Sequence, residues 1–90
     1  MTAPKEEKLL DFPCDFPIKM MGREQPEFCD AAVALIERHT GKIRSDAIRT
    51  ALSRNGNFLS ITITIKARNQ QQLDDIYSDL SAHEEILVAL

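Results

Sequence analysis

Cysteine and histidine often supply nucleophiles or metal ligands, and this chain of 90 residues has two of each. Cys14 stands between two Phe-Pro pairs, in the stretch DFPCDFP. A reactive thiol needs a neighbouring cation or a helix N-terminus that favours the thiolate, whereas the next residue here is the carboxylate Asp15. We therefore interpret Cys14 as structural, with a catalytic or redox thiol as the alternative.

The other cysteine and the histidines do not form a metal-binding or nucleophilic set. Cys29 and His39 fall within one predicted helix at a spacing that places them on different sides. His83 is distant from both, and two cysteines outside a CxxC arrangement are too few for a zinc site or a disulfide framework. The sequence predicts no catalytic residue, no metal and no cofactor, and we expect a protein that is not an enzyme.

Composition narrows the class of molecule. A net charge of -3 argues against nucleic-acid binding by general electrostatic attraction. Residues 1–8, MTAPKEEK, lack the apolar centre of a signal peptide, and no run reaches the roughly 20 apolar residues of a membrane span. We expect one cytoplasmic domain over residues 9–90, a flexible tail over residues 1–8, and neither nucleic acid nor membrane among the partners.

The strongest periodicity lies in residues 58–67, FLSITITIKA, where apolar and polar residues alternate. The predicted inner side carries Leu59, Ile61, Ile63, Ile65 and Ala67. This period of two predicts a strand with one buried face. The Asn-Gly pair just before it is typical of a hairpin turn, so residues 47–53 should form the partner strand, with Ile48 and Leu52 inward.

Helical periodicity flanks this hairpin on both sides. In the segment PEFCDAAVALIERHTG, one predicted helix face carries Phe28, Ala32, Leu35, Ile36 and His39. Pro26 suits the first helical position and Gly41 the stop. A second helix is predicted to begin after the N-cap Asn69, with Gln72 at the third helical position. Its apolar stripe consists of Leu73, Ile76, Tyr77 and Leu80.

Strands are also expected at FPIKMM, residues 16–21, and at EILVAL, residues 85–90, which gives the order β-α-β-β-α-β. With right-handed crossovers, this order closes as a ferredoxin-like α+β fold, a four-stranded antiparallel sheet with two helices on one face. The other face of the sheet is then bare, and we expect function to lie there.

These segments together resemble a known family. The stretches LLDFPCDFPIKMMG, SRNGNF, SITIT and QLDDIYSDL are similar to those of the small bacterial UPF0250 (DUF493, YbeD-like) proteins. The resemblance implies a ferredoxin-like fold similar to the ACT regulatory domains, no established enzymatic activity, and a link to lipoate or amino-acid metabolism. Arg54 departs from the family pattern, which has a second serine there, and this puts a hydroxyl-based site at the hairpin in doubt.

An ACT-like sensor of a small-molecule, amino-acid effector is the main alternative function. ACT domains bind the effector at a turn after the first strand, where a glycine lets the ligand approach the backbone. The candidate effector loop here is Gly22 and Arg23. Glu27 follows Pro26 where a glycine is typical, and its charge would oppose a ligand carboxylate at the helix N-terminus. We favour the interpretation that Gly22 relaxes a turn and Arg23 is solvated.

RNA-recognition domains share this order of elements, but they stack bases on aromatic residues of the outer sheet face. The residues expected on that face here are Lys19, Ser60, Thr62 and Thr64, and only Phe58 offers a ring. We therefore do not expect RNA binding.

Charge is uneven along the chain. Residues 38–54 carry five cations against the single carboxylate Asp46, whereas residues 74–85 carry five carboxylates and no Lys or Arg. This asymmetry either steers a charged partner or is only solvated surface.

We interpret the chain as a small regulatory or adaptor domain that presents its exposed sheet face, or an edge strand, to a protein partner or to itself as a homodimer. The candidate interaction face consists of Lys19, Met21, Ser60, Thr62, Thr64 and Lys66.

Overall fold

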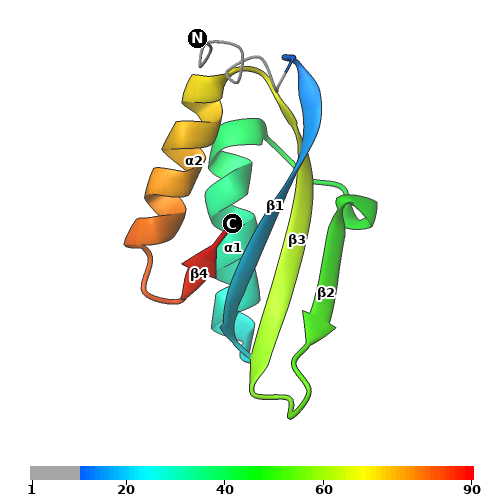
Figure 1. Cartoon of the computed structure of the whole chain (residues 1–90), viewed down its shortest axis with the longest axis vertical. Coiled ribbons are helices and arrows are strands. Elements are labelled where there is room, and N and C mark those ends of the chain that lie inside the picture. Colours follow the sequence, from blue (N-terminus) through cyan, green and yellow to red (C-terminus); the bar gives the residue numbers. More distant parts are fainter. Residues whose placement is uncertain (1–10) are drawn as a thin grey trace, which may run out of the picture.

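Residues 11–90 are described by the structure, a computed structural model, so the tail predicted over residues 1–8 lies outside the described residues. The elements follow in the predicted order, with a short 3-10 turn, η2, before the second strand (Figure 1). Their bounds are β1 Cys14–Arg23, α1 Pro26–Thr40, η2 Ser45–Ala47, β2 Ile48–Leu52, β3 Phe58–Ala67, α2 Gln70–Ala82 and β4 Val88–Ala89. The predicted α+β ferredoxin-like fold is thereby confirmed.

The four strands form one antiparallel sheet in the order β2-β3-β1-β4. The two central strands pair along their whole length, from Cys14 opposite Ala67 to Arg23 opposite Phe58. Both helices lie on one side of this sheet (Figure 1). Because residues directly opposite each other in an antiparallel pair point to the same face, the register assigns every strand residue to the helix side or to the outer side.

The core fills the layer between the sheet and the helices. The helix side of β3 buries Ile61, Ile63 and Ile65, and the apolar stripes of α1 and α2 cover them. Its fully buried large side chains are Ile18, Met20, Phe28, Ile36, Ile61, Ile63, Ile76 and Leu80. Since each such side chain contributes about 1.5–3 kcal/mol on burial, this single layer of apolar residues is what holds the helices to the sheet.

The helix ends follow the predicted signals. Pro26 is the first residue of α1, and Gly41 ends it with φ of 83°, a left-handed conformation that costs glycine little. Asn69 is the N-cap of α2, and its Oδ1 accepts the N–H of Gln72 at 2.8 Å. The helix α1 therefore begins and ends where the sequence indicated, and α2 begins where it indicated.

The edge strands differ from prediction. The strand β2 is shorter than the expected residues 47–53, and Leu52, although it points to the predicted side of the sheet, is not buried there: its side chain is 60% exposed. The register places Leu52 on the helix side opposite Leu59, but β2 is the outermost strand and the helices pack over the other strands (Figure 1). The hairpin itself is confirmed, with a loop at residues 53–57 in which Gly56 has φ of 76°. The closing strand is also shorter than the predicted residues 85–90.

Candidate functional site

The outer face of the sheet carries the candidate site. The register directs alternate residues of β1 and β3 away from the helices. All six residues of the predicted interaction face fall on this outer side, namely Lys19, Met21, Ser60, Thr62, Thr64 and Lys66. None of these six is among the buried residues, and they form one continuous surface because β1 and β3 are neighbours.

Two rows of side chains cross the outer face from β4 to β2. Met21 lies opposite both Val88 and Ser60, and the row from β4 to β2 reads Val88, Met21, Ser60 and Ala51. We call this the apolar row; Met21 and Val88 are 41% and 44% exposed. The neighbouring row, which we call the basic row, reads Leu90, Lys19, Thr62 and Arg49.

The basic row places two cations on either side of one hydroxyl. Lys19 on β1 and Arg49 on β2 both lie opposite Thr62 of the strand between them. Lys19 and Leu90 are joined by two backbone hydrogen bonds, of 3.4 and 2.7 Å, which sets Leu90 on the outer face as well. An exposed apolar residue beside exposed cations makes this part of the outer face both apolar and positively charged.

The outer face is positively charged although the chain is negative overall. By the register, its strand residues include the cations Lys19, Arg23, Arg49 and Lys66. Asp15 is the one carboxylate that these described strands direct outward, and its Oδ1 lies 3.3 Å from Nζ of Lys66. Asp46 reaches the rim of the face from η2 and is paired with Arg44 at 3.0 Å. A chain with a net charge of -3 thus collects cations on one side of its sheet.

Four residues of the two rows were not in the predicted face: Arg49, Ala51, Val88 and Leu90. The signal for Arg49 was present, because it alternates with Ile48, which was predicted to point inward. The position of Val88 depends on how the short strand β4 meets β1, and a two-residue strand has too little alternation to reveal that register.

The predicted effector residues lie at the end of β1. Gly22 is buried within the strand, and a Cβ built on it would lie 2.6 Å from Cδ1 of Phe28 and 2.7 Å from the carbonyl oxygen of Glu85. This glycine therefore admits the Phe28 ring. Arg23 is exposed and lines a shallow hollow with Glu84 and Glu85. Carboxylates so close disfavour the carboxylate of an amino acid there, and the effector loop stays a prediction.

The candidate chemical residues are dispersed. Cys14 and Cys29 are half-buried free thiols that pack against the core. Nε2 of His39 lies 2.6 Å from Oδ2 of Asp79 and joins α1 to α2, while Nδ1 of His83 accepts the N–H of Glu85 at 3.1 Å. Within residues 11–90, no three His, Cys, Asp or Glu side chains come together as a metal-binding group. In the same part of the chain, no helix has the length and apolar character that a membrane span requires.

Tyr77 secures the C-terminal end of the outer face. Its hydroxyl, on α2, donates to the carbonyl oxygen of Leu90, and its ring packs against the core. Burial raises the pKa of the Tyr77 phenol above its ordinary value of 10.0, because the anion would lose solvation. Tyr77 thus fixes the strand that contributes Val88 and Leu90 to the two rows.

Fold and site together define an α+β domain of ferredoxin-like topology with one basic sheet face that neither of the described helices covers. Comparison with known proteins then gives the family. The family described as "Protein of unknown function (DUF493)" matches residues 7–90. The chain is 40% identical to a UPF0250 protein of Paraburkholderia phymatum over 98% of this chain and 99% of the relative. A UPF0250 protein of Neisseria meningitidis serogroup A is 40% identical over the full length of both chains. One from Nitrosomonas europaea is 36% identical, with 94% and 98% covered. The chain belongs to the UPF0250 (DUF493) family.

Proposed function

We propose that the chain is a non-enzymatic adaptor or regulatory domain that docks an acidic surface of a partner protein on the outer face of its sheet. The observation that carries this proposal is the pair of adjacent rows: Lys19 and Arg49 for charge, and Met21 and Val88 for apolar contact. Protein interfaces combine an apolar centre with charged groups whose signs complement those of the partner.

The charges favour a different protein over a second copy of the chain. In a two-fold homodimer the same patch meets itself, so two copies joined through this face would bring four strand cations from each copy into one interface, against a single outward strand carboxylate, Asp15, from each. Pairing between the open β2 edges of two copies is also disfavoured. Arg49 is exposed on β2, and charged side chains on an edge strand oppose pairing with another edge. An acidic partner removes both conflicts.

Two other occupants are less well supported. Base stacking needs aromatic rings on the outer face, and the described strands offer only the half-buried Phe58. An ACT-like sensor of an amino acid would use Gly22 and Arg23, where Phe28 already fills the space beside the glycine. The link to lipoate or amino-acid metabolism stays a prediction of the family resemblance, and so does the cytoplasmic location.

Photo-crosslinking from defined positions tests which face docks the partner. A photoreactive amino acid replaces Met21 or Thr64 on the outer face, or Gln71 on the exposed side of α2 as the matched control. After irradiation in native lysate, we expect one and the same protein to be captured from both outer positions and not from the control. The captured protein is then purified, and its affinity for the chain should fall as salt is added.

Three results would contradict the proposal. Capture from Gln71 alone would move the interface to the helices. A crosslinked product that ribonuclease removes would identify RNA as the occupant. A product consisting only of two copies of this chain would establish a homodimer in place of an adaptor.

A further inference from the structure

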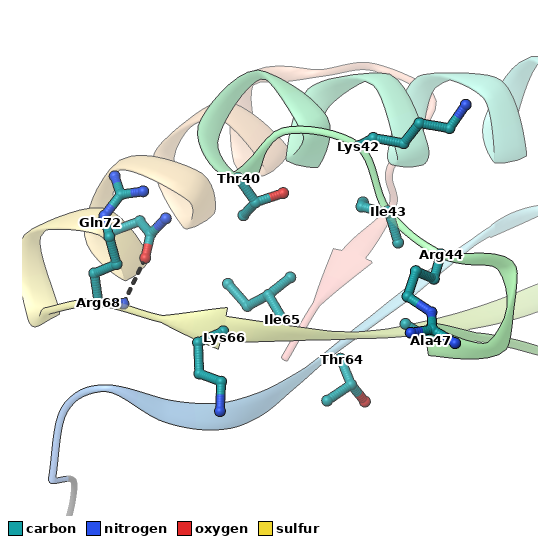
Figure 2. A pocket seen from close by; sticks show the side chains of 10 residues that line it. All are labelled: Thr40, Lys42, Ile43, Arg44, Ala47, Thr64, Ile65, Lys66, Arg68 and Gln72. Atoms are coloured by element: carbon teal, nitrogen blue, oxygen red, sulfur yellow. Dashed lines mark hydrogen bonds between the residues drawn. The ribbon is translucent and has the colours of Figure 1, made fainter.

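A cleft of about 290 Å³ opens at the end of β3 that lies beyond β2. The register explains it: β2 pairs with β3 only as far as Ile63, whereas β1 continues to Ala67, so the last residues of β3 have a neighbour on one side only. The cleft is lined by Thr40, Lys42, Ile43, Arg44, Ala47, Thr64, Ile65, Lys66, Arg68 and Gln72 (Figure 2).

Four of these ten residues are cations and none is a carboxylate. Arg44 and Lys66 each have a carboxylate neighbour outside the cleft, Asp46 at 3.0 Å and Asp15 at 3.3 Å. Within residues 11–90, Lys42 and Arg68 form no ion pair. Uncompensated positive charge gathered around a hollow is the electrostatic environment that attracts an anion.

The helix dipoles account for only part of this charge. Lys42 follows the C-terminus of α1, where a cation is favourable without any ligand. Arg68 has the opposite position: it immediately precedes Asn69, the N-cap of α2, where a cation is unfavourable and an anion is favourable. The charge of Arg68 is therefore not explained by the helix, and an anion in the cleft would relieve it.

The base of the cleft is ordered and contains a donor. Gln72 is only 6% exposed; its Oε1 accepts the N–H of Arg68 at 2.8 Å, and its Nε2 donates to the carbonyl of His39 at 3.0 Å. A side-chain amide has two N–H groups, and the second one of Gln72 forms no hydrogen bond within residues 11–90. Figure 2 shows Thr40, Ile43 and Ile65 around the middle of the cleft, so apolar surface adjoins the polar groups.

We propose that this cleft binds the phosphate group of a small phosphorylated molecule between Lys42 and Arg68. Arginine and lysine together bind phosphate through charge-assisted hydrogen bonds, and the volume is at the small end of the range for ligand sites. Ile43 and Ile65 would contact a short apolar part of the ligand. In Figure 2 the ammonium of Lys42 points away from β3; an exposed lysine changes rotamer within nanoseconds, so it can turn over the cleft.

Amide chemical-shift titrations of the chain alone test this site, independently of any docked protein. The probes are inorganic phosphate and phenyl phosphate, each compared with sodium chloride at the same ionic strength. We expect saturable shifts of the amide signals of Thr40, Ile65 and Arg68, with tighter binding of phenyl phosphate than of free phosphate because of the apolar wall. Equal affinity for both probes would reassign the site to free phosphate and overturn the phosphorylated ligand.

Matched double variants separate the cleft from general electrostatics. Lys42→Met with Arg68→Met should weaken phenyl phosphate binding at least about tenfold. Arg38→Met with Arg54→Met removes the same charge from exposed positions that do not line the cleft and should leave the affinity unchanged. Shifts that follow ionic strength alone, or equal losses in both double variants, would overturn the proposed site.

Discussion

Gly22 shows how a single residue can have a structural role at a position where an effector site was the alternative interpretation. It lies within β1, and the ring of Phe28 occupies the space that a side chain would need. The sequence places this glycine before a helix that begins at Pro26, which also fits a ligand-binding turn. The close approach of α1 to β1 distinguishes a structural glycine from a ligand-binding turn. This approach depends on tertiary packing, which no local sequence pattern encodes.

Gly22→Ala should destabilise the protein by about 1–3 kcal/mol, the usual cost of forcing an extra methyl group into a packed site. The free energy of unfolding by urea measures this. In a Phe28→Leu background the penalty should shrink, because the smaller side chain vacates part of the space beside residue 22. An equal penalty in both backgrounds would contradict a clash with Phe28 and assign the cost to the carbonyl oxygen of Glu85, which the added Cβ would approach to 2.7 Å.

Tyr77 gives a second prediction at the residue scale. Burial raises the pKa of the Tyr77 phenol, so the folded state holds its proton to higher pH than the unfolded state does. The associated stability is fully present below the ordinary pKa of 10.0 and is lost as pH rises through the raised pKa. The chain has one Tyr and no Trp, so the ultraviolet absorbance of tyrosinate follows Tyr77 alone. The midpoint should lie higher in the native protein than in urea; a lower native midpoint would refute the burial.

Alternation predicted which side of β3 is buried, because a period of two is a local property of the strand. It did not predict that Leu52 is exposed, although this residue also lies on the helix side. The burial of Leu52 depends on whether a helix extends over the edge strand β2, and the sequence of β2 does not indicate whether one does.

At the scale of elements, Gln72 joins the end of α1 to the start of α2. It was predicted as part of the N-terminal cap of α2, and its backbone N–H does bond to Asn69. Its side chain reaches further, to the N–H of Arg68 and the carbonyl of His39. The local sequence pattern predicted the N-terminal cap of α2, whereas the link between the two helices forms only when both are packed on the sheet.

Gln72→Ala should cost about 1–3 kcal/mol of stability, because it leaves partly buried backbone groups without hydrogen bonds. Gln71→Ala is the matched control: Gln71 is exposed, bonds only to Asp75 at 2.9 Å among the described residues, and should change stability by less than about 0.5 kcal/mol. Urea unfolding of both variants measures the difference. Similar small losses for the two would show that Gln72 does not join the helices.

At the scale of the whole molecule, the order of the strands in the sheet separates the basic block of the sequence from its acidic block. The basic block around residues 38–54 contains β2, at one edge of the sheet, and the acidic block at residues 74–85 contains most of α2, which packs near β4 at the other edge. Sequence revealed the asymmetry because charge can be counted. The two rows on the outer face could not be predicted, because they depend on registers between strands far apart in the chain.

The most direct test of the docking face neutralises its basic row and measures affinity for the captured partner. Lys19→Gln with Arg49→Gln is compared with Arg38→Gln and Arg54→Gln, which remove the same charge from α1 and from the hairpin loop. We predict that the first pair weakens binding about tenfold or more and reduces its dependence on salt, while the second pair binds like the native chain. Native affinity in the Lys19 and Arg49 double variant would contradict the proposal that the outer face docks the partner.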